Sequence, residues 1–264
     1  MRVLTVSSWA EFIGLTTELD GWAFRGQADA RWPLQSSLSR YLTQYVEDRG
    51  AWGVQEQRAI RIFRRKAHNY ISDPGALYDD LRCVGMMQHH GAPTRLLDFT
   101  KSPHVAAFFA LERALGISSV YALNTPALWL NRAVPTASPQ LTRDFIDPRS
   151  PGNFEKLFLS NEHSVIWFGE PAEMDQRLIA QAGMFVVPGV IDQTLEEILA
   201  GYGGSEELLC KIELPIELRK SAMRELYRLN ITNASLFPDL DGLAHSVALE
   251  LEMVWPPRRP PDSR

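Results

Sequence analysis

The segment from Gln88 to Leu111, QHHGAPTRLLDFTKSPHVAAFFAL, places several polar side chains beside an apolar run. Two adjacent histidines, His89 and His90, precede a Gly-x-Pro turn, so we expect both in a loop rather than in a regular helix. Adjacent side chains point in different directions on most backbones, which argues against both ligating one metal. Either histidine could contact a ribose hydroxyl, stack on a base, or act as an acid or base near neutral pH. The alternative is that one histidine anchors the loop to a main-chain carbonyl.

Arg95, Asp98 and Thr100 follow in the same segment. The leucines and the phenylalanine between them are expected to face the core, so that these three polar side chains project toward a cleft or toward one another. In a cleft, Arg95 would bind a phosphate, and Asp98 would orient Arg95 or carry charge near a reacting carbon. The competing interpretation is an internal Arg95–Asp98 salt bridge, which is costly to bury without further hydrogen bonds.

A second arginine stands near the end of a predicted strand, WAFRGQ, over residues 22–27. The planar guanidinium of Arg25 can form paired hydrogen bonds with a phosphate or a carboxylate. Gly26 would let a ligand approach the backbone, and Gln27 could add an amide contact. The alternative for Arg25 is a structural ion pair at a turn.

Two later segments add candidates. The run RLIAQAGMFVVP, residues 177–188, places Gln181 and Gly183 just before a predicted buried strand. The run LFPDLDG, residues 236–242, places Asp241 at a turn, where we interpret it as the N-cap of a helix.

Several kinds of site lack their motifs. No HxH, HExxH or DxD spacing occurs among the candidate residues of the 88–111 segment, and the sequence contains no GxSxG, no Walker loop and no GxGxxG. A metal site assembled from Asp98, His89, His90 and His104 therefore has no spacing to support it, and we expect no metal cofactor.

The composition is that of an ordinary globular chain of 264 residues, with 45% hydrophobic and 22% charged residues. Its net charge of −5 gives no global reason to expect nucleic acid. Cys83 and Cys210 stand among apolar neighbours and are expected to be buried, reduced thiols. We find no apolar N-terminal segment of signal-peptide length and no apolar run of membrane-spanning length, so we expect a cytoplasmic protein without a membrane partner.

The elements that must position these residues form a mixed set. Helices are predicted over 9–15, 52–71, 77–87, 103–115, 194–202 and 216–229, and after residue 241. Strands are predicted over 22–27, 120–123, 164–168, 184–187 and 208–214. Repeated prolines mark about 125–153 as a loop-rich insertion, and the tail 256–264 is predicted to be disordered. This pattern predicts one α+β domain with a helical N-terminal portion.

Five motifs together resemble the FRG domain family, which is named for the Phe-Arg-Gly at residues 24–26. The others are QHHGAPTRLLDFT, PHVAAFFAL, QAGMF and LFPDLDG. They run from about Trp22 to Ala244, so the resemblance covers most of the chain, and we predict an FRG domain over 1–255. The family name describes a sequence and implies no reaction.

A second resemblance is to ADP-ribosyltransferases of the Arg-Ser-Glu type, which implies a central split β-sheet flanked by helices. Arg25-Gly26 resembles their first element, residues 98–100 fall where a Ser-Thr-Ser strand is expected, and residues 181–183 fall where Glu-x-Glu is expected. The resemblance implies that Arg25 holds the diphosphate of NAD, bound as a substrate, and that Thr100 supports the active-site strand. Gln181 and Gly183 depart from the glutamate pair and cannot supply its negative charge. Asp98, Glu170 or Glu173 could supply it from elsewhere.

Three functions remain open at this stage. The first is an NAD-using enzyme that transfers ADP-ribose to a protein or nucleic-acid acceptor, or cleaves the nicotinamide bond. In that enzyme Arg25, Gln27, His89, Arg95 and Thr100 would bind the cofactor, whereas His90, Asp98 and Gln181 would serve catalysis. The second is a non-catalytic module that senses a nucleotide in a stress or phage-defence setting. The third is a metal-independent phosphodiesterase or nuclease that uses His90 and Asp98.

Overall fold

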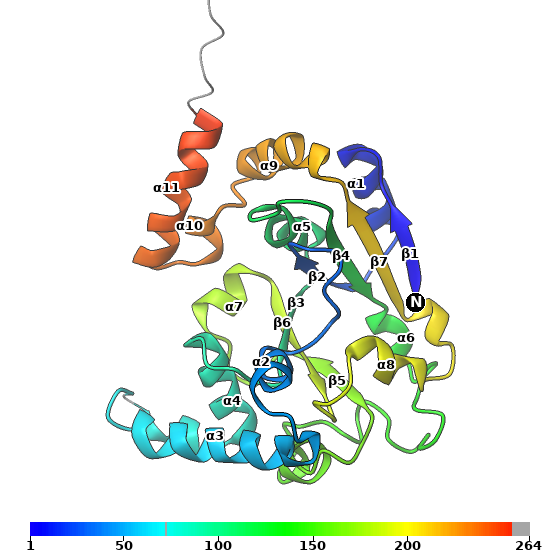
Figure 1. Ribbon diagram of the computed structural model, residues 1–264, viewed down its shortest axis with the longest axis vertical. Helices are drawn as coiled ribbons and strands as arrows, with labels where there is room; N and C mark the ends of the chain where they lie inside the picture. Colours follow the sequence, from blue (N-terminus) through cyan, green and yellow to red (C-terminus); the bar gives the residue numbers. More distant parts are fainter. Residues whose placement is uncertain (72, 255–264) are drawn as a thin grey trace, which may run out of the picture.

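A seven-stranded mixed β-sheet lies at the centre of the protein in the computed structural model, which describes residues 1–71 and 73–254 (Figure 1). The strands stand in the order β1-β7-β4-β2-β3-β6-β5, and all neighbours are antiparallel except the parallel pair β1 and β7. They are β1 (Arg2–Thr5), β2 (Ala23–Gln27), β3 (Leu97–Thr100), β4 (Ser118–Leu123), β5 (Ile166–Gly169), β6 (Gly183–Pro188) and β7 (Leu209–Leu214). A single mixed sheet flanked by helices confirms the predicted α+β class.

Helices cover the sheet at both ends of the molecule. They are α1 (Trp9–Thr17), α2 (Ser37–Tyr45), α3 (Trp52–Ala67), α4 (Asp80–His89), α5 (Pro103–Leu111), α6 (Thr125–Trp129), α7 (Gln176–Ala180), α8 (Leu195–Ala200), α9 (Arg219–Arg228), α10 (Asn233–Leu236) and α11 (Leu240–Val254). In Figure 1, α1, α5 and α9 lie at the end of the molecule that holds β1, β7 and β4, whereas α3 and α4 lie at the opposite end. Every helix in the described part of the chain is too short or too polar to span a bilayer.

Local capping explains where several helices begin. Ser8 accepts a hydrogen bond from the main-chain N–H of Glu11 and caps α1. Pro103 occupies the first turn of α5, where its missing N–H costs nothing. Thr194 and Glu197 form a capping box at the start of α8.

The sheet opens between β2 and β3. These strands share a single register pair, Phe24 with Thr100, whereas β2 pairs with β4 along its whole length. Beyond Phe24, the main-chain pairing between β2 and β3 stops, and the side chain of Arg25 donates instead to the main-chain oxygen of Asp98. The strands therefore diverge at the position of the Phe-Arg-Gly motif.

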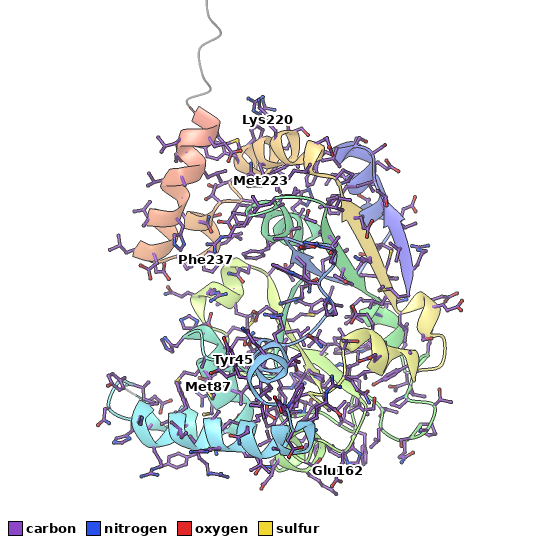
Figure 2. The ribbon with its side chains drawn as sticks, in the orientation of Figure 1. Tyr45, Met87, Glu162, Lys220, Met223 and Phe237 are labelled. Carbon is purple, nitrogen blue, oxygen red and sulfur yellow. The ribbon has the colours of Figure 1, made fainter. Side chains whose placement is uncertain are left out.

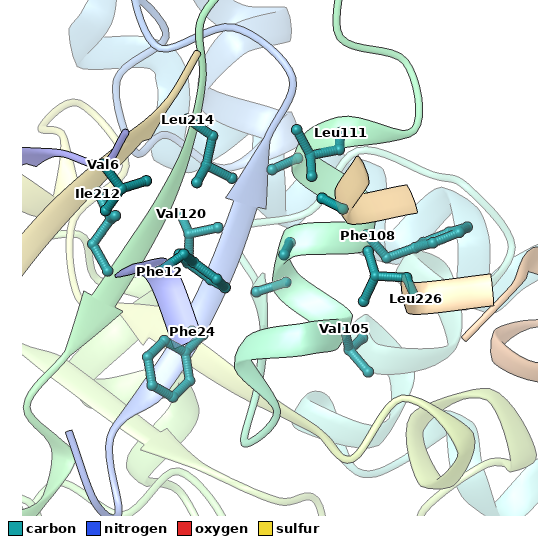
Figure 3. Packing of buried hydrophobic residues seen from close by; sticks show 14 of the residues in the cluster. Val6, Phe12, Phe24, Val105, Phe108, Leu111, Val120, Ile212, Leu214 and Leu226 are labelled. Atoms are coloured by element: carbon teal, nitrogen blue, oxygen red, sulfur yellow. The ribbon is translucent and has the colours of Figure 1, made fainter. Parts of the chain in front are cut away.

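Two apolar clusters pack helices against different parts of the sheet, and a third cluster joins its two halves. Phe24, Val120 and Ile212 of the first half pack against Phe108 of α5 and Phe12 of α1 (Figure 3). In the second half, side chains of β6 pack against α3 and α4. The third cluster contains side chains of β2 and β4 together with side chains of β3 and β6, so the two halves share a core beside the opening.

Several element boundaries differ from the sequence predictions. The strand β1 and the helix α2 were not predicted. The N-terminal portion begins with β1, which pairs with β7, and the hydroxyl of Thr5 donates to Glu213, 208 residues further along the chain. Asp239, rather than Asp241, accepts the hydrogen bond from the main-chain N–H of Gly242 in the first turn of α11. Cys83 and Cys210 are buried free thiols, as predicted. The predicted disordered tail at 256–264 lies outside the described residues.

Candidate functional site

Arg25 carries a guanidinium that lies partly buried where β2 and β3 diverge. Its Nη1 donates to the main-chain oxygen of Asp98 at 2.6 Å, and its Nε is buried without a hydrogen-bond partner. Within the described residues, no carboxylate oxygen lies within 4.0 Å of it. Removal from water lowers the pKa of Arg25, the charge of Asp98 partly offsets this effect, and the charge of Arg40 adds to it. Because arginine stays protonated in proteins, this site holds a cation without an ion-pair partner.

Gly26 serves packing rather than ligand approach, which corrects the expectation from the sequence. A Cβ at this position would lie 1.9 Å from the main-chain oxygen of Ala106 and 2.6 Å from the main-chain nitrogen of Ala110. Both atoms belong to α5, so the missing side chain lets this helix lie directly against β2. Gly26 thus allows α5 to pack closely against β2, and the neighbouring Arg25 lies at the opening between β2 and β3.

A cleft of about 210 Å³ occupies the opening between β2 and β3. Its lining includes Arg25, Asp98, Thr100, Phe109, Arg177 and Gln181. Three of the predicted elements therefore meet there: the strand with Arg25, the segment with Asp98 and Thr100, and the turn with Gln181. A smaller space of about 20 Å³ adjoins it, because both are lined by Asp98, Arg177 and Gln181.

The carboxylate of Asp98 is oriented by Gln88. The Nε2 of Gln88 donates to Oδ2 of Asp98 at 3.0 Å, and its Oε1 accepts a short hydrogen bond from the hydroxyl of Thr94. This arrangement fixes the amide orientation, since a carboxylate oxygen accepts and must therefore face the amide nitrogen of Gln88. Sequence reasoning did not identify Gln88, although it opens the same motif as the histidines.

Thr100 and Gln181 tie β3 to the turn that precedes β6. The hydroxyl of Thr100 donates to the main-chain oxygen of Gln181 at 2.7 Å, and the side-chain Nε2 of Gln181 donates to the main-chain oxygen of Leu236 at 3.0 Å. Both side chains are buried. Thr100 thus supports the strand, and the amide nitrogen of Gln181 is already engaged with the C-terminal region.

Arg177 also lines the cleft and was not among the predicted site residues. Its guanidinium carbon lies 4.7 Å from the centre of the Phe237 ring, and Phe237 in turn contacts Phe109 edge-on. Figure 2 shows Phe237 beside α7, which carries Arg177. The motif LFPDLDG therefore reaches the cleft through Leu236 and Phe237.

The two histidines lie at the end of α4, not in a loop as their sequence suggested. His89 is the last helical residue, and His90 is the C-cap, because the helix continues until the left-handed Gly91. The Nδ1 of His89 lies 3.0 Å from Oδ2 of Asp175, and the histidine rings meet edge-on at 4.9 Å. His89 lines both the small space that Asp98 also lines and an adjoining hollow of about 330 Å³, whereas His90 lines the hollow and not the small space. The assignment of His90 and Asp98 as a catalytic pair stays a prediction.

Arg95 does not reach the cleft. Its side chain is 0% exposed and forms a two-point ion pair with Glu56 of α3, with Nε 2.7 Å from Oε1. Its Nη1 also donates to the main-chain oxygens of Pro188 and Gly189. Neither a ligand phosphate nor Asp98 is its partner, because all its donors are satisfied inside the protein.

Gln27 also falls outside the cleft. It is buried, and its Nε2 donates to the main-chain oxygen of Pro33 at 3.2 Å, on the loop that follows β2. As a strand residue two positions after Arg25, it lies beyond the point where β2 faces β3.

No three His, Cys, Asp or Glu side chains of residues 1–71 and 73–254 are grouped as metal ligands would be. The side chains that line the cleft supply two guanidiniums, one carboxylate, a hydroxyl, an amide and phenylalanine rings.

Comparison with known proteins gives one result. Residues 20–116 match the model of the FRG domain, so the chain contains an FRG domain, as its motifs predicted. No curated protein and no solved structure matched the chain. The match includes the motifs that carry Arg25, Asp98 and Phe109, whereas those that carry Gln181 and Phe237 lie beyond it and contact the same cleft. The predicted extent of the domain, 1–255, stays a prediction.

Proposed function

We propose that this protein binds a nucleotide-type ligand in the cleft between β2 and β3, with a phosphate on the guanidinium of Arg25. The observation that carries the proposal is a partly buried cation that forms no ion pair within the described residues, whose Nε has no hydrogen-bond partner and whose charge Asp98 offsets only in part. Burying an unpaired charge costs free energy, and an anion at this position would offset that cost. A guanidinium suits a phosphate, since its planar fork forms two parallel hydrogen bonds.

Other groups at the cleft fit the rest of such a ligand. Phe109 offers an aromatic surface, and the small space beyond Asp98 leads toward His89. The main-chain oxygens of Asp98 and Gln181 are already hydrogen-bonded by the protein, so specificity rests on side chains. NAD and ADP-ribose are the ligands that the second sequence resemblance implies.

Calorimetric titration with NAD and ADP-ribose tests this proposal. Wild type is expected to bind at least one of them, and Arg25→Ala is expected to weaken binding about 10- to 100-fold, the loss of one or two charge-assisted hydrogen bonds. Arg25→Lys keeps the charge without the fork and should fall between them. Arg31→Ala, which removes an exposed arginine paired with Asp29, is the matched control and should bind as wild type does. Equal affinity of wild type and Arg25→Ala, or no binding to wild type, contradicts the proposal.

A second candidate is that the bound nucleotide is NAD and that the protein breaks its nicotinamide bond, transferring ADP-ribose to water or to an acceptor. Asp98 favours it, because this carboxylate lines the cleft while positions 181 and 183 carry Gln and Gly. A carboxylate there could stabilise positive charge on the ribose as nicotinamide leaves. Release of nicotinamide that Asp98→Asn abolishes, with NAD affinity kept within about threefold, would support it. Binding without loss of NAD on prolonged incubation would instead identify a non-catalytic binding module.

A further inference from the structure

We propose that Arg177 is a second anion-binding residue and that the ligand of the cleft carries a diphosphate, an inference that rests on the proposed nucleotide function. Arg177 lines the cleft and the small space beside it. It comes from α7, whereas Arg25 comes from β2, so the two guanidiniums approach the same hollow from separate elements. Nothing in the sequence resemblance gives Arg177 a role.

The guanidinium of Arg177 is held in place without being neutralised. No hydrogen bond from this side chain, and no carboxylate within 4.0 Å of it, occurs in the described part of the chain. Its one defined contact is with the ring of Phe237 at 4.7 Å, a cation–π arrangement that restricts its position and leaves its donors available. Most arginines of this protein that are not fully exposed are paired instead, as Arg64 is with Asp80 and Arg219 is with Glu252.

The charge of the cleft matches a diphosphate better than a single phosphate ester. Two arginines line it against one carboxylate, and Arg40 adds positive potential at Arg25. The carboxylate of Asp98 accepts a hydrogen bond from Gln88, and both residues line the small space beside the cleft. A diphosphate that joins two groups carries two negative charges, one for each guanidinium, and its two phosphorus centres can occupy two walls of one hollow.

Phe237 is the positioning residue for Arg177. It is partly buried, meets Phe109 edge-on at 6.0 Å, and follows Leu236, whose main-chain oxygen holds Gln181. The C-terminal α10 thereby supports both Gln181 and Arg177 from outside the segment that matches the FRG model. Loss of this ring would leave the guanidinium free to move without removing its charge.

The test compares inorganic pyrophosphate with orthophosphate by calorimetric titration of the full chain. Arg177→Gln should weaken pyrophosphate binding about tenfold or more while changing orthophosphate binding less than about threefold, since one charge-assisted contact is lost from the larger ion alone. Phe237→Leu should weaken pyrophosphate binding by a smaller factor and leave orthophosphate unchanged. Arg228→Gln, an exposed arginine on α9 paired with Glu225, is the matched control and should change neither.

The outcomes separate this inference from the proposed function. If Arg177→Gln binds pyrophosphate as wild type does, while Arg25→Ala does not, the second anchor is wrong and the first stands. If Arg177→Gln weakens the binding of pyrophosphate and orthophosphate equally, the two arginines hold a single phosphate, and the inference of a diphosphate is wrong. If neither Arg25→Ala nor Arg177→Gln changes the binding of either ion, both proposals fail. Arg177→Lys, which is expected to retain part of the affinity, provides the answer if thermal unfolding shows that Arg177→Gln is not folded.

Discussion

Arg25 and Arg95 stand in similar sequence surroundings, yet the protein uses them in different ways. Both follow or precede apolar residues of a strand, and both belong to segments that resemble FRG motifs. Arg95 is sealed at 0% exposure against Glu56 and two main-chain oxygens. Arg25 has one main-chain acceptor, a buried Nε without a partner, and an opening in front of it. The difference lies in the partners and in the depth of burial, not in the type of residue.

This comparison separates a structural arginine from one that is available to a ligand. Arg95 joins α3 to the strand end at Pro188 and Gly189, and so connects two parts of the second half of the sheet. Its charge is neutralised inside the protein, and a ligand would gain nothing from it. For Arg25 an anion would supply the neutralisation that the protein lacks. The same substitution at the two positions should therefore have opposite effects on stability and on binding.

The largest effect is expected for Arg95→Met. This change leaves the carboxylate of Glu56, which is 3% exposed, without its cation, and should lower the free energy of unfolding by about 3–5 kcal/mol. Chemical denaturation followed by circular dichroism measures it. Arg58→Met, on the exposed face of the same helix α3, is the control and should stay within about 0.5 kcal/mol of wild type. A loss below about 1 kcal/mol for Arg95→Met would show that the pair is not structural.

A double substitution sharpens this result. In Glu56→Leu with Arg95→Met, no unpaired charge remains, so the double variant should be more stable than Arg95→Met alone. If the double variant loses the sum of the two single effects, the two side chains do not act as a pair.

Gly26→Ala should have the next largest effect on stability. The added methyl would overlap main-chain atoms of α5 rather than a flexible side chain, so the helix must move from β2, at about 1–3 kcal/mol for an overpacked site. Gly14→Ala is the control, because no atom lies within 4 Å of a Cβ there and the position is inside α1, where alanine stabilises the helix by about 0.5–1 kcal/mol. Thermal unfolding of both variants would decide it. Should the two glycines respond alike, the contact of α5 with β2 is not what requires Gly26.

Local patterns predicted much of this fold because the elements concerned are defined by their own residues. The periodic helix α3, the capped helix α8 and the buried strand β6 were all located from sequence. The strand β1 was not, because its four residues, three of them exposed, carry little pattern and depend on β7 for their pairing.

The candidate site was predicted in part, and the omissions have a common cause. Arg25, Asp98 and Gln181 do line one cleft. The partner of Arg95 lies 39 residues earlier, and the position of Arg177 depends on Phe237, so neither contact has a local signal. One signal could have been used: Glu56 falls on the same helical stripe as the buried Ile60 and Ala67 of α3, and a carboxylate on an apolar face requires a buried partner.

The smallest effect on stability is expected for Arg25→Met, and it is the one that tests the comparison most directly. The variant loses a hydrogen bond from Nη1 to the main-chain oxygen of Asp98 but also removes a charge whose pKa is lowered by burial, so the two contributions oppose each other. We expect the free energy of unfolding to change by less than about 1 kcal/mol, several-fold less than for the same substitution at Arg95. Chemical denaturation and calorimetric titration with pyrophosphate, carried out on the same sample, give the free energy of unfolding and the affinity for the anion. A loss of stability as large as that of Arg95→Met would mean that the fold itself requires Arg25, and the proposed phosphate contact of this guanidinium would then lose its basis.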